Sequence, residues 1–335
     1  MQRAAFVALF VCLGRAEAGP LSFSDSCGDW MVLQQAPAKA AVTGLLNTTA
    51  TGTVEVSVSG GSGPTYKVQA TVSKNDADPE NPDPENPAPA GYRWKAFLKP
   101  TMAGGDYTIT ATSGAWKAEI AHVTFGDVWY CSGQSNMALP LLHTMSRNIS
   151  GEAIAAGKYA NLRIHGMAGN MNPTQNWTTV KDAYDQLTTG KKGAGQHSLF
   201  TYSSTCYYFG ESLIDKLGAS APPIGLIHTA WGGSRIESWV DNNTLVECYN
   251  STGQPIPTDQ GTANFHKERV VPYQDSRYIC LLACLPACLP ACLPACLLAC
   301  LLARLSACPP VRLRACLPAC LPPARLSASP HHATA

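Results

Sequence analysis

The chain has 335 residues, a length that fits about two domains. Its 24 basic and 23 acidic residues nearly cancel, so the composition shows neither the basic excess of a nucleic-acid-binding protein nor an acidic solvating tail. The 45% hydrophobic fraction allows a core of ordinary size and excludes a chain that is disordered throughout. We therefore expect a globular protein with no nucleic acid partner.

The first 18 residues are typical of a secretory signal. Arg3 supplies the positive start, residues 4–13 are apolar but too short to span a bilayer, and Ala16-Glu17-Ala18 forms a cleavage site. A buried N-terminal helix is the alternative. The signal predicts a protein of the secretory pathway, secreted or lysosomal. Five glycosylation sequons agree with it, at Asn47, Asn148, Asn176, Asn242 and Asn250.

The 14 cysteines divide the chain into two unlike segments. Nine lie between Cys280 and Cys320, so a bare count would wrongly suggest a disulfide scaffold over the whole chain. In an oxidising compartment, pairing is permitted among four of the others, but spacing does not define the pairs. These four are Cys27, Cys131, Cys206 and Cys248, while Cys12 would leave with the signal.

Residues 19–122 alternate as short strands and predict a β-sandwich domain. The expected strands cover 54–58, 68–72, 92–98 and 107–112, with glycine and proline between them. The duplicated pentapeptide at 78–87, Asp-Pro-Glu-Asn-Pro repeated, interrupts this pattern. Because it is rich in proline and acidic residues, it predicts a solvated loop, with a calcium site from its carboxylates as the alternative.

Residues 123–279 change to strands that alternate with helices, which predicts a parallel sheet with crossover helices. Strands are expected at 122–131, 161–165 and 223–230. A helix is expected at 203–217, capped by Ser203 or Ser204 and stopped by Gly218. Sites in such sheets lie at the carboxyl ends of the strands. Two glycine-bearing turns follow such ends, one around Ser135 and one around Gly232.

Ser135 comes directly after a predicted strand and before a helix. A serine in this position is held on a sharp turn with its hydroxyl exposed, and Gly133 lets the backbone make the turn without a Cβ clash. N–H groups at the helix start point toward the same space and can stabilise an oxyanion. Acyl transfer needs this geometry, although a serine before a helix is more often a simple N-cap.

Several ordered motifs resemble the sialate O-acetylesterase family, a branch of the SGNH hydrolases. They cover about residues 20–245. The central block is Gly126-Asp127-Val128-Trp129 followed by Cys131-Ser132-Gly133-Gln134-Ser135-Asn136-Met137. The others are Trp30-Met31-Val32-Leu33-Gln34, Cys206 with Phe209-Gly210, Pro223-Ile224-Gly225-Leu226-Ile227, Trp231-Gly232-Gly233-Ser234 and Ile236-Glu237-Ser238-Trp239.

The resemblance implies an SGNH-hydrolase-like α/β domain with a flavodoxin-like three-layer fold. It implies removal of acetyl esters from sialic acids, with Ser135 as nucleophile and Gly133, Gln134 and Asn136 supporting its turn. The oxyanion donors would be the N–H groups of Ser135 and of Gly232 or Gly233, between which the sequence does not choose. No metal and no organic cofactor is expected.

Two later parts of the family pattern are missing. No Gly-Glu-Ser-Asn block follows residue 245, and no Asp-x-x-His occurs anywhere in the chain. We therefore expect an incomplete hydrolase domain without its general-base histidine, and a rate reduced by several orders of magnitude. An acetylesterase for other acetylated polysaccharides and a catalytically dead carbohydrate-binding protein are the alternative functions.

From Cys280 the chain becomes a Cys-Leu-Pro-Ala repeat, and residues 280–335 are expected to be a disordered tail. A membrane helix is disfavoured because Pro286, Pro290 and Pro294 recur every fourth residue. A cysteine array for metal or disulfides and a proline-rich linker are further alternatives. The favoured explanation is a translated DNA repeat, because the four-base unit CTGC encodes Leu-Pro-Ala-Cys. On this hypothesis the chain is truncated or misannotated.

Overall fold

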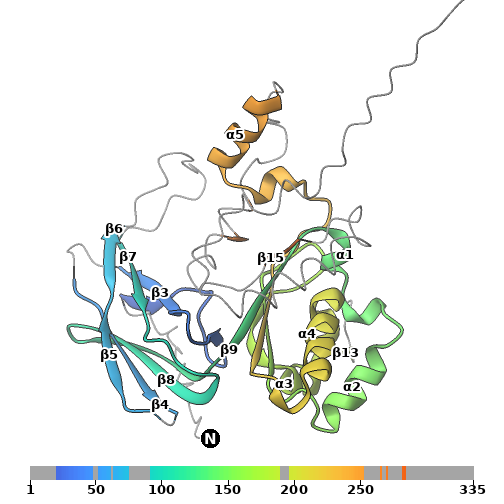
Figure 1. Cartoon of the computed structure of the whole chain (residues 1–335), viewed down its shortest axis with the longest axis horizontal. Helices are drawn as coiled ribbons and strands as arrows, with labels where there is room; N and C mark the ends of the chain where they lie inside the picture. The colour runs from blue at the N-terminus through green and yellow to red at the C-terminus, as the bar shows by residue number, and fades with distance from the viewer. Residues whose placement is uncertain are drawn as a thin grey trace, which may run out of the picture.

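The computed structural model describes residues 20–47, 52–61, 63–74, 91–188, 196–252, 265, 269–270 and 281–283. The predicted signal, the duplicated pentapeptide and nearly all of the repeat tail lie outside these ranges. Within them the chain is a mixed α/β structure, with antiparallel strands at one end and, at the other, parallel strands beside most of the helices (Figure 1).

The strands, in chain order, are β1 (Leu21–Phe23), β2 (Val32–Gln34), β3 (Ala41–Leu46), β4 (Glu55–Gly60), β5 (Tyr66–Gln69), β6 (Thr71–Lys74), β7 (Tyr92–Phe97), β8 (Gly104–Ser113), β9 (Trp116–Ser132), β10 (Leu162–Gly166), β11 (Gln175–Thr179), β12 (Leu187–Thr188), β13 (Gln196–His197), β14 (Ile224–His228) and β15 (Leu281–Ala283). The α-helices are α1 (Ser135–Ala138), α2 (Arg147–Ala155), α3 (Val180–Asp185), α4 (Ser204–Leu217) and α5 (Asn242–Thr252). Short 3-10 turns cover Leu141–His143, Ser198–Thr201, Gly218–Ser220 and Ile236–Trp239.

Two sheets contain most of the strands. One is four-stranded and antiparallel, in the order β1-β3-β7-β6. The other is nine-stranded, in the order β11-β10-β14-β9-β8-β4-β5, with β2 and β15 also paired to β9. Leu46 and Trp94 of the first sheet share a core with Val56 and Ile109 of the second. An independent sandwich domain over 19–122 stays a prediction, because the second sheet continues into the parallel strands.

The strand β9 connects the two halves of the chain. Its 17 residues pair antiparallel with β8 at the start and parallel with β14 from Asp127 to Cys131. The Val32–Gln34 segment of the predicted N-terminal motif pairs parallel with β9 at Thr124–Gly126. The predicted boundary between 122 and 123 therefore falls inside one continuous strand, which joins the antiparallel and parallel parts of the sheet.

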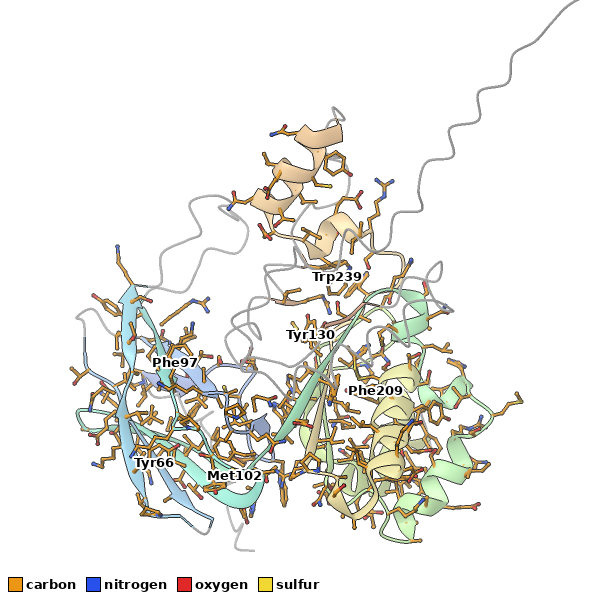
Figure 2. All side chains as sticks on the ribbon, viewed as in Figure 1. Tyr66, Phe97, Met102, Tyr130, Phe209 and Trp239 are labelled. Carbon is orange, nitrogen blue, oxygen red and sulfur yellow. A yellow bond between two sulfur atoms is a disulfide. The ribbon has the colours of Figure 1, made fainter. Side chains whose placement is uncertain are left out.

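The parallel strands β10, β14 and β9 carry the crossover architecture that the sequence predicts. Alternate residues enter two different cores, as the period of two in a strand requires. Tyr130 and Ile227 join the core of the antiparallel strands, whereas Cys131 and Leu226 join a second core with the helices. Phe209 of α4 contacts Trp129 from this second side, with ring centroids 4.8 Å apart (Figure 2).

The mixed α/β part of the fold prediction is confirmed, and the three-layer arrangement stays a prediction. The helices α2, α3 and α4 lie together on one side of the parallel strands (Figure 1). The other face carries Val128, Tyr130, Ile227 and Trp177, which pack with Met31 and Val32 instead of with a second helix layer.

Two local predictions are corrected. The strand expected at 68–72 is divided into β5, which pairs with β4, and β6, which pairs with β7. The chain changes sheets at Ala70, whose N–H donates to Val54 O at 2.9 Å. The tail predicted from 280 includes β15, which pairs parallel with β9 at Tyr130–Ser132. Its Leu-Leu-Ala sequence can join the sheet because this edge of β9 has backbone groups to pair.

The predicted helix at 203–217 is confirmed as α4. Ser203 is its N-cap, and its side chain accepts a hydrogen bond from Cys206 N. Gly218 ends the helix with a φ of +57°, which a glycine adopts without a Cβ penalty. The helix therefore starts beside the turn that carries Ser135 and runs back along the sheet.

Candidate active site

The turn after β9 holds Ser135 as the sequence predicts. Gly133 has a φ of +141°, and α1 begins at Ser135. A Cβ on Gly133 would meet its nearest neighbour, Met137 Cβ, at 3.5 Å, so the backbone angle and not a clash requires glycine. Gln134 occupies the N-cap position without a side-chain cap. The alternative role of Ser135 as an N-cap is therefore excluded, because Ser135 is the first helical residue.

Ser135 and Asn136 are exposed, whereas Met137 and Ala138 are buried beneath them. The N–H groups of Met137 and Ala138 both donate to Gln134 O, at 2.9 and 3.0 Å. The N–H groups of Ser135 and Asn136 precede these bonds, as at any helix start. The exposed hydroxyl and the first backbone donors of α1 thus lie at the surface at the carboxyl end of β9.

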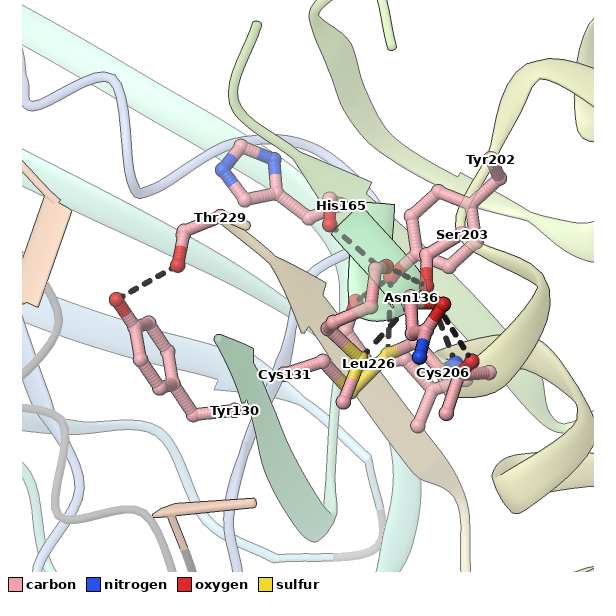
Figure 3. The surroundings of a disulfide bond; sticks show 11 residues. Tyr130, Cys131, Asn136, His165, Tyr202, Ser203, Cys206, Leu226 and Thr229 are labelled. Atoms are coloured by element: carbon pink, nitrogen blue, oxygen red, sulfur yellow. Dashed lines mark hydrogen bonds between the residues drawn. A yellow bond between two sulfur atoms is a disulfide. The ribbon is translucent and has the colours of Figure 1, made fainter. Parts of the chain in front are cut away.

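Residues at the start of α4 donate hydrogen bonds to the backbone oxygens of α1 and of the residue after it. Ser203 Oγ donates to Met137 O at 2.6 Å, and the Ser204 N–H donates to Leu139 O at 2.7 Å. Thr205 Oγ1 donates to Asn136 O at 2.9 Å (Figure 3). A helix of four residues cannot pair its own last carbonyls, so these three donors complete it. They fix the backbone that carries Ser135.

A disulfide joins the same two elements. Cys131, four residues before Ser135, is bonded to Cys206 in the first turn of α4, with the Cα atoms 5.8 Å apart (Figure 3). The sequence permits pairing among four cysteines, and the structure selects this pair. Cys27 is a free thiol. The strand end and the helix start are therefore linked both covalently and by hydrogen bonds.

The second glycine turn lies next to the first. Thr229 N donates to Cys131 O at 3.0 Å, and Trp231 N donates to Gly133 O at 2.9 Å, so the chain after β14 follows the chain after β9. The Gly232 N–H donates to Asn170 Oδ1 at 3.1 Å and is therefore occupied. Gly233 has a φ of +83°, and a Cβ there would meet no atom within 4 Å. Among the described residues, the Gly233 N–H has no acceptor, and the choice between the two glycines as oxyanion donor stays open.

None of the described histidines forms a hydrogen bond with Ser135. His122 stacks on Trp30 at 4.2 Å between ring centroids, and His197 stacks on Tyr184 at 3.9 Å. His165 is buried against Trp177, while His143 is exposed on a 3-10 turn. Over the described ranges, the Ser135 hydroxyl makes no hydrogen bond, with a histidine or with any other group. His266 lies outside those ranges.

His228 is the described histidine packed beneath the Ser135 turn. It is the last residue of β14, is fully buried, and lies close to the Met137 backbone. Desolvation, reinforced by the nearby positive charge of Arg269, lowers the pKa of His228 to about 3. This neutral, buried imidazole makes no hydrogen bond with Ser135 among the described residues.

Sequence reasoning missed Arg269, which lies in a segment without a motif. Its side chain is buried and donates to Thr229 O at 3.1 Å and to Ala168 O at 2.8 Å. Its guanidinium lies 4.7 Å from the ring centroid of Trp231. The Tyr130 hydroxyl donates to Arg269 O and accepts from Thr229 Oγ1, and burial raises the pKa of Tyr130. These contacts tie the loops around Trp231 together, and nothing in the local sequence signals them.

A cavity of about 500 Å³ lies at the opposite end of the parallel strands. Asn161 and Arg163 at the start of β10, and Pro222 and Pro223 before β14, form part of its wall. Ligands in open α/β sheets bind at the carboxyl ends of the strands, so we place the candidate site at Ser135 and not in this cavity.

Several further predictions can be compared with the described residues. Asn47, Asn148, Asn176 and Asn250 are exposed, as glycosylation requires, although glycosylation itself stays a prediction. Over the ranges that are described, no group of three or more metal-binding side chains occurs. None of the helices in those ranges has the length and apolar character that a bilayer crossing requires.

Comparisons with known proteins agree with this architecture. The fold is similar to that of a carbohydrate acetylesterase from Xanthomonas citri, with a TM-score of 0.50 and 22% identity, over 78% of this chain and 50% of that one. This likeness shows the fold alone. No family model matches the sequence.

Curated relatives supply the family resemblance. Sialate O-acetylesterase of Mus musculus is 31% identical over 233 residues, 68% of this chain and 38% of the relative. The Homo sapiens sialate O-acetylesterase is 30% identical over 248 residues, 72% of this chain and 42% of the relative. The chain thus has a sialate O-acetylesterase-like family resemblance over about two thirds of its length. It spans about two fifths of the length of these relatives.

Proposed function

We propose that this chain is a carbohydrate O-acetylesterase whose nucleophile is Ser135. The observation that carries the proposal is the position of Ser135. It is exposed at the first residue of α1, on a turn that needs the positive φ of Gly133, beside the Gly232–Gly233 turn. The names of the relatives point to O-acetylated sialic acid as substrate, and other acetylated sugars are the alternative. A secreted or lysosomal setting belongs to the same proposal.

In this reaction, Ser135 Oγ bonds to the acetyl carbonyl carbon while a base takes the hydroxyl proton. The carbonyl oxygen becomes an oxyanion that the N–H groups of Ser135 and Gly233 stabilise. The bond to the sugar oxygen then breaks and that oxygen takes up the proton, which leaves an acetyl-enzyme. Attack by water releases acetate and restores the serine.

The described residues hold no histidine that is hydrogen-bonded to Ser135 and could act as its general base. Because no described imidazole reaches Ser135, we expect turnover far below that of an enzyme with a complete triad. Oxyanion stabilisation and binding alone leave about 10³–10⁴-fold acceleration over water in serine hydrolases whose triad has been removed. The unpartnered hydroxyl also favours the second candidate function, a carbohydrate-binding protein that has lost its chemistry.

The test uses the oxidised, full-length chain with p-nitrophenyl acetate and with an O-acetylated sialic acid. Ser135→Ala should abolish both hydrolysis and labelling by a fluorophosphonate, a probe that forms a serine–phosphorus bond as fluoride leaves. Ser146→Ala is the matched control, because Ser146 is exposed at the start of α2 and its side chain makes no cap. Equal rates in the two variants would exclude Ser135 as nucleophile. Sugar binding without turnover or labelling would establish the binding protein instead.

A further inference from the structure

We propose that Asn170 is a positioning residue that holds the Gly232–Gly233 turn and directs the Gly233 N–H toward the oxyanion. This inference rests on the proposed function for its catalytic consequence. Its structural part can be tested even if the protein has no esterase activity. This part states that Asn170 binds the Gly232 backbone and that the Gly233 N–H has no acceptor among the described residues. Asn170 lies in the loop between β10 and β11, outside every motif that the sequence singles out.

Two hydrogen bonds join the Asn170 side chain to the backbone of Gly232. Asn170 Nδ2 donates to Gly232 O at 2.9 Å, and Asn170 Oδ1 accepts from Gly232 N at 3.1 Å. A side-chain amide has one acceptor oxygen and a donor NH₂ group side by side, so it can bind both polar groups of a single backbone residue. Shorter Ser and acceptor-only Asp side chains cannot make this pair.

The pair of bonds determines where the next N–H points. In a trans peptide, the carbonyl of one residue and the N–H of the following residue point in opposite directions. Because Gly232 O faces Asn170, the Gly233 N–H faces away from it. No acceptor for this N–H occurs among the described residues, and a Cβ on Gly233 would meet no atom within 4 Å. Within the described part of the chain, this donor is therefore left without an acceptor.

The loop that carries Asn170 is itself fixed along the chain after β14. Met167 N donates to His228 O at 2.9 Å, and Ala168 O accepts from Arg269. Gly169 packs against Ala230 O so closely that a Cβ there would lie 2.9 Å from that oxygen. On the far side, the buried Asn172 donates to Thr201 O at 2.7 Å. Asn170 is thus held from both directions before it binds Gly232.

The glycine turn is held on its other side by the Ser135 turn, through the bond from Trp231 N to Gly133 O. Asn170 and Gly133 therefore hold the segment 231–232 from opposite ends. Because Asn170 is exposed, each of its hydrogen bonds to Gly232 contributes little to the stability of the protein without a ligand. Their effect is to select one orientation of the turn, which matters when charge develops on the acyl oxygen.

The first experiment measures amide exchange in ¹⁵N-glycine-labelled, oxidised full-length chain. We expect the Gly232 N–H to exchange several-fold more slowly than the Gly233 N–H, and Asn170→Ala to remove that difference. Asn176→Ala is the control, because Asn176 is an exposed asparagine on β11. A slower Gly233 N–H, or a difference that survives Asn170→Ala, would overturn the proposal.

The second experiment measures the rate of fluorophosphonate labelling at Ser135. Asn170→Ala and Asn170→Asp should both slow labelling about tenfold, because Asp keeps the acceptor for Gly232 N but places a carboxylate against Gly232 O. Asn176→Ala should label at the wild-type rate. Unchanged labelling in the Asn170 variants would refute the catalytic part. If the wild-type chain is not labelled at all, the proposed function fails, and the exchange result alone decides the role of Asn170.

Discussion

Thr205 Oγ1 donates a hydrogen bond to the backbone oxygen of Asn136 at 2.9 Å, across 69 residues of sequence. Through this bond the first turn of α4 holds the residue that follows the candidate nucleophile. Ser203 makes the equivalent contact one residue further on, to Met137 O. A four-residue helix has too few internal bonds to be stable alone, so the orientation of Ser135 depends on a distant segment of the chain.

Replacement of Thr205 should therefore lower the reactivity of Ser135. Thr205→Val keeps the side-chain shape and removes the donor, which should cost about 1 kcal/mol of stability. It should slow fluorophosphonate labelling of Ser135 about fivefold, whereas Thr205→Ser, which keeps the hydroxyl, should label at nearly the wild-type rate. Urea unfolding and labelling kinetics measure the two effects. Slower labelling in both variants to the same degree would contradict a role for the hydroxyl.

The Cys131–Cys206 disulfide closes a loop with a sequence separation of 75 residues. Cys131→Ala with Cys206→Ala should lower the free energy of unfolding by about 2–4 kcal/mol. Urea denaturation with and without reductant measures the loss, and reduced wild type should unfold near the double variant. Peptide mapping that found Cys131 linked to Cys27 or Cys248 would show that this pairing is wrong.

Acid should destabilise the fold through two buried histidines. Burial lowers the pKa of His165 to about 4 and that of His228 to about 3, against an ordinary 6.5. Below pH 6.5 the unfolded chain takes up protons that the folded chain excludes, so stability falls as pH falls. The slope is about 1.4 kcal/mol per pH unit for each histidine, down to its folded pKa.

Urea midpoints between pH 6 and pH 5 test this dependence. His228→Gln should remove about half of the slope that the two histidines cause, even if it lowers stability at pH 7. His143→Gln is the control, because His143 is exposed. An unchanged slope in His228→Gln would show that His228 is protonated in the folded protein. If the slope is steep, the free energy of unfolding is lower in an acidic lysosomal lumen than in the extracellular space.

Gly126 should tolerate no side chain. A Cβ there would lie 1.9 Å from Pro223 O, at the point where Asp127 N donates to the same oxygen and β9 meets β14. Gly126→Ala must separate the two strands and should cost about 3 kcal/mol or more. Gly63→Ala, where a Cβ meets nothing within 4 Å, should stay within about 0.5 kcal/mol. Thermal unfolding compares the two, and equal losses would contradict the close strand approach.

Local patterns predicted the longer strands of the fold and its longest helix. Alternation located the strands that became β4, β7 and β8, and a 3.6-residue period with a serine cap located α4. The strand–glycine–serine order placed Ser135 on its turn. These features depend on residues close in sequence, and for that reason a single chain is sufficient to recognise them.

The predictions that failed concern contacts between distant segments. The sequence could not show that β9 continues across the expected boundary at 122, or that the second face of the parallel strands is covered by Met31 and Val32. It also did not show that the Gly232 N–H donates to Asn170, 62 residues away. Arg269 and Asn170 belong to no periodic or motif pattern that could have marked them.

By itself, the sequence determined the change from antiparallel strands to alternating strands and helices, the glycine turns and the serine they carry, because backbone angles and hydrophobic periodicity are local properties. Only the tertiary structure decided which cysteines pair, which donors complete α1, which glycine N–H binds Asn170 and which histidines are buried. Each of these is a contact between groups that lie far apart in the sequence. Such contacts are determined by the packing of the whole sheet and its helices.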